Sequence, residues 1–321
     1  GCGLGRYVFY LSQFGINIEG LDFENETIKY LKAWSKSNNF SNLTFLQGDV
    51  TKLPYENNSL RGYISLGVVE HFYEGPQIPI REAFRVLQPG GVAIITVPAP
   101  SWSKIFFKTR TKIKNIIKPI IGKKIIKKPF FQYEYTSKKL SNFIKKEVFH
   151  ISRYSQADLL YTFTEFGRNS DKYIKNNRFG YGFSNFFESS WLRKLGAQSV
   201  VIGIKASEIM HCFLCGDFEA KLNVLNSFDV PICDKCQLTD NALHYRKNRP
   251  VEFHTKYLIS PPVQPPEKKI CDNCNKTYCT HEIFENYGLA SSICSNCLKN
   301  KSLNITIANT SLQPIYRSRR F

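Results

Sequence analysis

The chain has 321 residues, 42% of them hydrophobic, and a formal net charge of +18. Its length allows two or three domains, and its positive charge favours anionic partners such as nucleic acid, acidic lipid or phosphorylated substrates. No apolar run approaches the ~20 residues of a membrane-spanning helix. Nine of the ten cysteines follow residue 210, and eight of these nine form C-x-x-C pairs. This usage is typical of metal ligation in a reducing compartment rather than of disulfides.

The chain opens on a glycine-rich loop, Gly1-Cys2-Gly3-Leu4-Gly5-Arg6. Because glycine has no Cβ, its backbone N–H can closely approach a ligand at a helix N-terminus, which suits a nucleotide-like cofactor. The dinucleotide fingerprint G-x-G-x-x-G needs a glycine where Arg6 stands. The spacing therefore favours S-adenosylmethionine (SAM) over NAD, although a plain tight turn explains these six residues by themselves about as well.

A helix is expected to follow this loop, with Tyr7, Tyr10, Leu11 and Phe14 on its buried face and Gly15 as its stop. Such a loop normally follows a buried strand, yet no residue precedes it here and the sequence has no initiator methionine. We therefore expect the chain to be a fragment whose first strand, of about five apolar residues, lies upstream.

Strands and helices then alternate along the chain. Strands are expected over 16–22, 43–46, 62–66 and 92–97, and a helix opens at Pro79. This alternation predicts an α/β fold with a Rossmann-like, doubly wound, mostly parallel sheet. Ligands bind such sheets at the carboxyl ends of the strands, where the glycine loop, Asp22, Asp49 and residues 67–71 all fall.

Residues 1–98 resemble the class I SAM-dependent methyltransferases of the broad type 11 group, which includes the ubiquinone-biosynthesis methyltransferases. The resemblance lies, in order, in GCGLGR, the acid of GLDF, GDVTKLPYENNSL, ISLGVVEHF and REAFRVLQPGGVAIITVP. Residues 134–207 are expected to complete the fold with a helix and strand after Tyr135 and a last strand over 197–204. A methyltransferase domain would then span residues 1–207.

The resemblance implies a set of SAM-binding residues. They are Gly1, Cys2, Gly3, Gly5, Asp22, Phe23, Asp49, Val50, Leu66 and Gly67. In the implied arrangement the Asp22 carboxylate accepts hydrogen bonds from the ribose hydroxyls, and the Asp49 side chain meets the adenine amino group. Each acid also has a plain structural explanation, because Asp22 could be a helix N-cap and Asp49 could cap a turn.

The resemblance also places Glu70 and His71 at the substrate side. Methyl transfer from a sulfonium depends mostly on the alignment of the nucleophile, the methyl carbon and the sulfur, and it needs a base only when the nucleophile starts protonated. We expect His71 to be that catalytic base. A solvated or core histidine is the competing explanation.

A basic stretch, residues 102–131, lies within an insertion over 99–133. It holds ten Lys or Arg and no acid, and its isoleucines form a helical stripe that Pro119 must kink. This composition predicts an interfacial helix that binds anionic membrane surfaces. A solvated lid over the substrate pocket is an equal alternative, and binding to a nucleic-acid backbone is a third.

Two four-cysteine patterns occupy the last third of the chain. Cys212, Cys215, Cys233 and Cys236 form two C-x-x-C pairs separated by 17 residues, and Cys271, Cys274, Cys294 and Cys297 form two separated by 19. Both separations suit a zinc site in which two knuckles supply four thiolates. We therefore expect two zinc ions, with His211, Cys279 and His281 as spare ligands.

These patterns predict a zinc ribbon over 208–250, a proline-rich linker over 251–268, a second ribbon over 269–300 and a basic tail over 301–321. The ribbons would be metal-stapled folds or modules that recognise nucleic acid or protein. The whole is expected to be a cytoplasmic enzyme, peripheral at the membrane, that methylates a small or lipid-linked acceptor. Alternatives are an RNA- or protein-modifying methyltransferase whose ribbons hold the target, and a non-catalytic SAM- and zinc-binding interaction protein.

Overall fold

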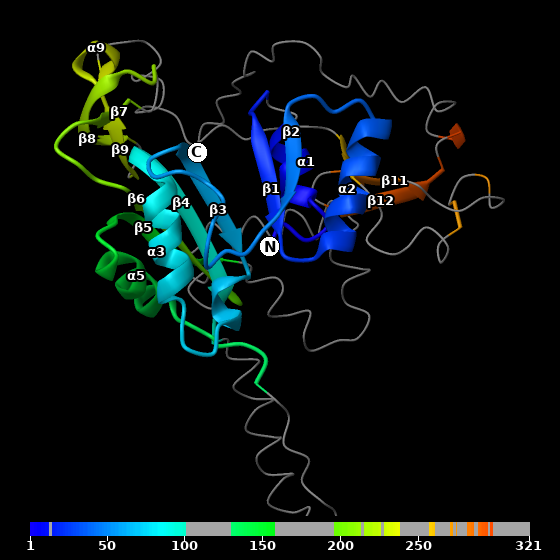
Figure 1. Ribbon diagram of the computed structural model, residues 1–321, viewed down its shortest axis with the longest axis horizontal. Coiled ribbons are helices and arrows are strands. Elements are labelled where there is room, and N and C mark those ends of the chain that lie inside the picture. The colour runs from blue at the N-terminus through cyan, green and yellow to red at the C-terminus, as the bar shows by residue number, and fades with distance from the viewer. Residues whose placement is uncertain are drawn as a thin grey trace, which may run out of the picture. The chain divides into compact units, whose positions relative to one another are not determined.

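A computed structural model describes the chain in two compact units, Gly1–Asp49 with Asn248–Phe321, and Val50–Lys247 (Figure 1). The described residues are 1–12, 15–100, 130–157, 196–212, 215–225, 228–237, 257–260, 270–271, 274, 281–285, 288–294 and 296–297. The predictions for residues 102–129, for Cys279 and for the tail 301–321 concern parts outside these ranges. None of the described helices has the length and apolarity needed to cross a bilayer.

The first unit begins with two helices and two strands. They are α1 Arg6–Ser12, β1 Ile18–Asp22, α2 Asn25–Ser37 and β2 Leu43–Gln47. β1 and β2 are parallel, with Ile18 opposite Leu43 and Asp22 opposite Gln47. Both strands therefore deliver their carboxyl ends, and the acid at the end of β1, to the same edge.

The buried face of α1 differs from the predicted one. Val8, Phe9 and Ser12 are buried, whereas Tyr7 is 59% exposed. The Phe9 ring packs between α2 and β2, with its centroid 4.9 Å from that of Trp34 and 5.4 Å from that of Phe45. The prediction was wrong because residues 7–11 are apolar or aromatic at every position, so periodicity alone does not decide which stripe is buried.

The C-terminal part of the first unit is an antiparallel sheet in the order β10-β11-β12. Its strands are β10 Tyr257–Ser260, β11 His281–Glu285 and β12 Gly288–Ile293. The hairpin β11–β12 belongs to the second cysteine pattern. β10 lies inside the segment predicted as a linker, where it is extended and paired with β11.

The second unit is built on a four-stranded sheet in the order β3-β4-β6-β5. Its elements are β3 Leu60–Leu66, η1 Val69–His71, α3 Gln77–Val86, β4 Leu87–Pro98, α5 Ser137–Lys146, β5 His150–Ala157 and β6 Gln198–Ile204. β3 and β4 are parallel, and β6 runs antiparallel to both of its neighbours, β4 and β5. The predicted Rossmann-like α/β fold is thereby confirmed.

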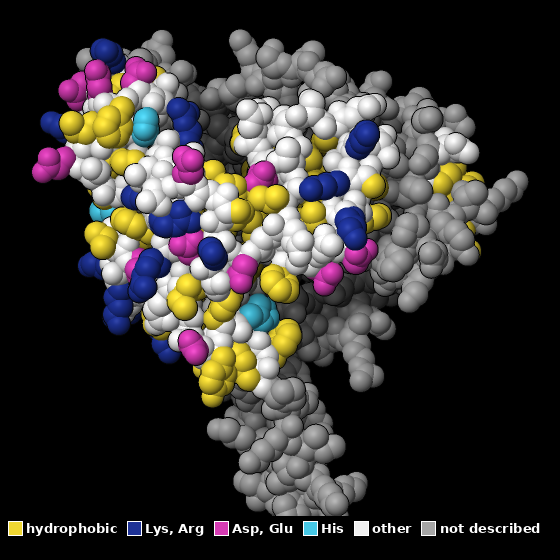
Figure 2. All heavy atoms as spheres, in the orientation of Figure 1, with side chains coloured by type: hydrophobic (Ala, Val, Ile, Leu, Met, Phe, Trp, Pro, Cys, Tyr) yellow, Lys and Arg dark blue, Asp and Glu magenta, His cyan; other side chains and the backbone are white. Residues whose placement is uncertain are grey.

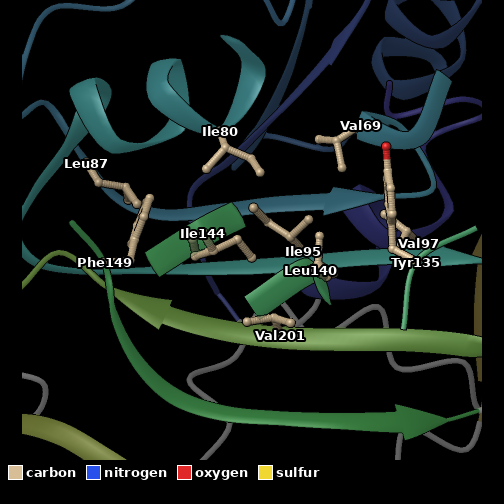
Figure 3. Close-up of a cluster of buried hydrophobic side chains, with 11 residues drawn as sticks. Val69, Ile80, Leu87, Ile95, Val97, Tyr135, Leu140, Ile144, Phe149 and Val201 are labelled. Carbon is tan, nitrogen blue, oxygen red and sulfur yellow. The ribbon is translucent and has the colours of Figure 1, made fainter. Parts of the chain in front are cut away.

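Helices α3 and α5 cover one face of this sheet, and the main core lies between them and the strands (Figure 3). The core residues are Val69, Ile80, Leu87, Ala93, Ile95, Val97, Tyr135, Leu140, Ile144, Phe149 and Val201. The apolar alternation of β4 supplies the sheet side of this core. It fixes the carboxyl end of β3, and with it the turn that carries Glu70 and His71.

Strand β4 begins earlier than expected, because it includes the Pro89-Gly90-Gly91 segment that was predicted as a turn. Gly90 has φ +85°, and its N–H donates to the Lys205 carbonyl oxygen at 2.8 Å. The Lys205 N–H in turn donates to the Gly91 carbonyl oxygen at 3.0 Å. Only glycine adopts this backbone at little cost, so the strand continues through the bend. Helix α3 likewise begins at Gln77, before Pro79.

The first cysteine pattern folds as a small sheet, β7-β8-β9, with a helical turn. Its elements are β7 Met210–His211, β8 Phe218–Leu225, β9 Phe228–Ile232 and α9 Asp234–Gln237. We call this segment, residues 208–237, ribbon 1. Its core is shared with the four-stranded sheet, because Ile204 and Val92 pack against the cluster of Met210, Cys212, Ala220, Ile232 and Cys233.

Ribbon 1 is attached to the sheet at the amino-terminal end of β4, away from the turn after β3 (Figure 1). A Cβ at Gly90 would lie 2.9 Å from the His211 carbonyl oxygen. On β5, which pairs with β6 at the edge of the sheet, His150 Nε2 lies 2.5 Å from Asp229 Oδ2, and Ser152 Oγ accepts the Asp229 N–H at 3.0 Å. Ribbon 1 is therefore a packed part of this unit.

In the described chain β1 pairs with β2 alone, and β3 pairs with β4 alone. Each of these strands thus has one edge without a ladder partner among the described residues. The upstream strand expected from the glycine loop stays a prediction.

Candidate functional site

The glycine loop is held by the acid at the end of β1. The Gly3 N–H donates to Asp22 Oδ2 at 2.7 Å, and the Glu24 N–H donates to Asp22 Oδ1 at 3.1 Å. The N-cap of α2 is Glu24, so Asp22 is not the helix cap that was its structural alternative. Because a carboxylate oxygen has two acceptor positions, each Asp22 oxygen can accept one further hydrogen bond, as contact with a ribose requires.

The glycines of the loop have different roles. Gly3 has φ +51°, and a Cβ there would meet no atom of the described residues within 4 Å, so these residues leave room for a ligand beside it. Gly5 has φ +70°, but a Cβ there would lie 3.0 Å from the rings of Phe9 and Phe45, so this glycine is required by packing. Burial, and after it the Asp22 charge, raise the pKa of Cys2 to about 11, which keeps the thiol protonated at neutral pH. The loop thus offers backbone groups rather than a nucleophile, which fits SAM.

The remaining predicted cofactor residues divide between the units. Phe23, 74% exposed, follows Asp22, and its carbonyl oxygen accepts a hydrogen bond from Gln47 at the end of β2. Asp49 is exposed and closes the N-terminal part of the first unit. Val50 opens the second unit, which also carries Leu66 and Gly67.

The loop after Val50 is fixed by two charged residues of α3 that the sequence analysis did not single out. Arg85 donates to the carbonyl oxygens of Tyr55 at 2.7 Å and Leu53 at 2.9 Å. Glu82 accepts the Leu53 N–H at 2.7 Å, and its hydrogen bonds from Arg85 lower the pKa of its carboxyl group. The motif REAFRV therefore matters for positioning this loop as well as for the core.

The carboxyl end of β3 turns sharply into η1. Gly67 has φ +69° and donates its N–H to the Thr96 carbonyl oxygen at 3.0 Å. A Cβ there would lie 3.5 Å from Glu70 Oε1. The side chain of Glu70 is 1% exposed, and burial raises the pKa of its carboxyl group.

His71, the predicted base, lies beside this buried acid. Its Nδ1 is 2.9 Å from the Phe131 carbonyl oxygen, and its Nε2 is 3.9 Å from Glu70 Oε1. Its side chain is 40% exposed, and its ring meets the Phe131 ring edge-on at 5.0 Å. It is therefore anchored, and it is not a core histidine.

Several aromatic residues of the 130–135 segment and the turn after η1 lie in the same part of the structure as His71, and most of them were not predicted as site residues. Tyr133 donates its N–H to the Glu70 carbonyl oxygen and its hydroxyl to the Tyr73 carbonyl oxygen, each at 2.9 Å. Tyr73 and Phe131 are 73% and 72% exposed, and Figure 2 shows hydrophobic side chains on the surface next to a histidine. The signal in the sequence was the pattern FFQYEY at 130–135, directly after the basic stretch.

The structure brings together both predicted groups of cysteines. In each group of four, the sulfur atoms lie within 4.8 Å of one another. The Cys233 N–H points at Cys212 Sγ at 3.4 Å, and the Cys294 N–H points at Cys271 Sγ at 3.3 Å. The spare candidate His211 has its Nδ1 at 3.0 Å from the Gly216 carbonyl oxygen. The cysteine groups fit zinc-ribbon-like modules, because four thiolates are the donor set of a structural zinc site.

A family model described as a methyltransferase domain matches residues 1–95. This part of the chain is similar to methyltransferase domains. The match ends inside β4, at Ile95, and it includes the glycine loop, Asp22, Asp49 and the turn with His71. The predicted resemblance to SAM-dependent methyltransferases is thereby confirmed for this segment.

Curated relatives carry related names. The demethylmenaquinone methyltransferase of Staphylococcus carnosus is 28% identical over 145 residues, 44% of this chain and 58% of the relative. That of Lactococcus lactis is 30% identical over 146 residues, 44% of this chain and 57% of the relative. The chain thus spans less than two thirds of the length of these relatives. Among solved structures, a SAM-dependent methyltransferase from Methanosarcina mazei is 17% identical with a TM-score of 0.44, covering 64% of this chain and 90% of that one.

Proposed function

We propose that this protein transfers a methyl group from SAM to a small or lipid-linked acceptor with a quinol-type ring. The observation that carries the proposal is the Asp22 carboxylate, which holds the glycine loop through Gly3 and keeps acceptor positions for a ribose. The match of residues 1–95 to a methyltransferase domain supports the same cofactor. The names of the curated relatives, which act on demethylmenaquinone, support the acceptor.

In this proposal the chain's residues mainly bind and align. SAM supplies an electrophilic methyl group on a sulfonium. The loop at Gly3 would present backbone groups to it, and Asp22 would accept hydrogen bonds from the ribose hydroxyls. The backbone of Leu66 and Gly67 would face the methionine end, and His71 would take a proton where the acceptor starts protonated. Most of the acceleration comes from alignment in a dry pocket, up to ~7–11 kcal/mol in well-oriented systems.

The surroundings of His71 support an aromatic acceptor. Phe131 exposes ring surface next to the imidazole, Tyr73 and Phe130 form a second exposed ring pair with centroids 5.2 Å apart, and planar rings stack favourably on such faces. The basic stretch 102–129, which directly precedes Phe130 and Phe131 in the chain, would bring the site to an anionic membrane where a lipid-linked acceptor resides.

The cysteine groups would each hold one zinc ion with a structural role. Ribbon 1 shares its core with the four-stranded sheet at the end of β4 that is opposite the turn with His71. This placement supports zinc as part of the fold of the second unit, rather than ribbon 1 as a clamp for a macromolecular target beside His71.

The test is incubation of the protein with methyl-labelled SAM and a fractionated lysate, alongside a reduced demethylmenaquinone. Label in the quinol or the lipid fraction is the expected result. Label in RNA or protein would replace the acceptor class. No label in any fraction, with SAM bound in calorimetry, would leave a SAM-binding interaction protein.

A further inference from the structure

The tautomer of His71 follows from its contact with the chain. Nδ1 lies 2.9 Å from the Phe131 carbonyl oxygen, which can only accept a hydrogen bond. The proton of the neutral imidazole is therefore on Nδ1, and Nε2 carries the lone pair. Because 40% of the side chain is exposed, a ligand can reach the ring.

Glu70 is a buried acid, and one of its two carboxyl oxygens lacks a hydrogen bond within the described residues. Its side chain is 1% exposed, and within the described residues its Oε2 has no hydrogen-bond partner. Among those residues His71 is the one cation-forming group recorded in a pair with it. Burying a carboxylate without a partner costs several kcal/mol of free energy. A neighbouring group that becomes positively charged, such as the His71 ring, is therefore stabilised by Glu70.

The distance between the two side chains leaves Nε2 available. Glu70 Oε1 lies 3.9 Å from Nε2, which is close enough for an ion pair and too long for a hydrogen bond. The lone pair of Nε2 is thus not consumed by Glu70. The other titratable groups along these segments are the phenols of Tyr73, Tyr133 and Tyr135 and the carboxyl groups of Glu74 and Glu134.

We propose that Glu70 is a positioning residue, which stabilises the His71 imidazolium formed when Nε2 takes the proton of an acceptor O–H. This inference rests on the proposed function and narrows its acceptor to a hydroxyl-bearing ring, because a base helps only a protonated nucleophile. The electron pair of the broken O–H bond would stay on oxygen, an oxygen lone pair would form the bond to the methyl carbon, and the electron pair of the broken C–S bond would stay on sulfur. The imidazolium returns its proton to solvent through its exposed edge.

The fixed backbone of Glu70 supports this assignment. The Glu70 carbonyl oxygen accepts the Tyr133 N–H at 2.9 Å, while the Phe131 carbonyl oxygen faces Nδ1 at 2.9 Å. The segment 131–133 therefore contacts both members of the pair. A Cβ at Gly67 would lie 3.5 Å from Glu70 Oε1, so the turn packs against the carboxyl group from the other direction.

The experiment follows the His71 ring by NMR in the full chain without SAM. The variants are Glu70→Gln, which removes the charge, Glu70→Asp, which keeps it, and Glu74→Gln, an exposed acid in the next turn. His71→Gln assigns the resonance among the six histidines. In Glu70→Gln the midpoint of the ring's titration should move to lower pH, because the imidazolium loses its neighbouring charge. Glu70→Asp should retain part of that effect, and Glu74→Gln should resemble the wild type.

Activity supplies the second arm. With labelled SAM and a phenolic acceptor, Glu70→Gln should lower the maximal rate and move the acidic limb of the pH profile to lower pH, with the KM for SAM unchanged. Equal titration midpoints in wild type and Glu70→Gln would overturn the pairing even if methyl transfer is observed. A moved midpoint in a protein that transfers no methyl group would instead overturn the proposed function.

Discussion

Replacing Gly90 with alanine tests whether ribbon 1 is a packed part of the methyltransferase sheet. Gly90 has φ +85°, and a left-handed backbone costs a residue with a Cβ ~1–2 kcal/mol. The new methyl group would lie 2.9 Å from the His211 carbonyl oxygen and 3.0 Å from Met210 Cβ, both in ribbon 1. Forcing that backbone to shift adds ~1–3 kcal/mol. We expect a total destabilisation of ~2–5 kcal/mol, located at the junction.

The chain offers a matched control in Gly62, on the neighbouring strand β3. A Cβ there would meet no atom within 4 Å in the part of the chain that the structure describes, and alanine is favoured over glycine within a strand by ~0.5–1 kcal/mol. Gly62→Ala should therefore be neutral or slightly stabilising. The two variants add the same methyl group and differ in the contact with ribbon 1 and in the backbone conformation.

Hydrogen exchange measured by mass spectrometry is the suitable assay, because a chain with two compact units has no single free energy of unfolding. Peptides covering β6 and β7 should exchange at least ~30-fold faster in Gly90→Ala, whereas peptides from α2 should be unchanged. The reasoning is refuted if Gly90→Ala exchanges as slowly as the wild type, or if Gly62→Ala accelerates these peptides equally.

Three further predictions concern the ligands. Asp22→Ala should weaken SAM binding at least ~10-fold in calorimetry, because charge-assisted hydrogen bonds are worth ~1.5–3 kcal/mol. The control Glu26→Gln, which changes an exposed acid, should bind SAM normally. Equal SAM affinities of the wild type and Asp22→Ala would show that Asp22 is not part of the site. Metal analysis should find about two zinc ions per chain and about one in Cys233→Ser, and two ions retained in that variant would exclude the first cysteine group. Deletion of 102–129 should abolish sedimentation with anionic vesicles; unchanged sedimentation would leave the lid as the explanation of that stretch.

The strands and helices between residues 16 and 98 could be predicted because their apolar residues repeat with the period of the element that buries them. The burial of Ile80 and Ala83 on α3 follows directly from that pattern, and the near-continuous apolar run 92–97 predicted β4 as a strand without deciding which of its residues are most buried. The face of α1 could not be predicted, because its sequence is apolar all round. Gly90 was taken as part of a turn, because a glycine with positive φ inside a strand and one in a turn look alike in sequence.

The site was predictable where one local motif supplies it and unpredictable where distant segments meet. Asp22 and the cysteine groups are set by short, recognisable spacings. The Phe131 carbonyl oxygen that fixes the tautomer of His71 comes from 60 residues along the chain, and the Asp229 carboxylate on His150 comes from 79 residues along. Neither contact can be predicted from a local sequence pattern, because a backbone carbonyl is present at every residue and lone acids are common on surfaces. Glu70 and His71 are neighbours in sequence, and the turn at Gly67 places them so that the acid is buried and the imidazole beside it is accessible. The chemistry we assign to that turn therefore depends on the fold as much as on the residues.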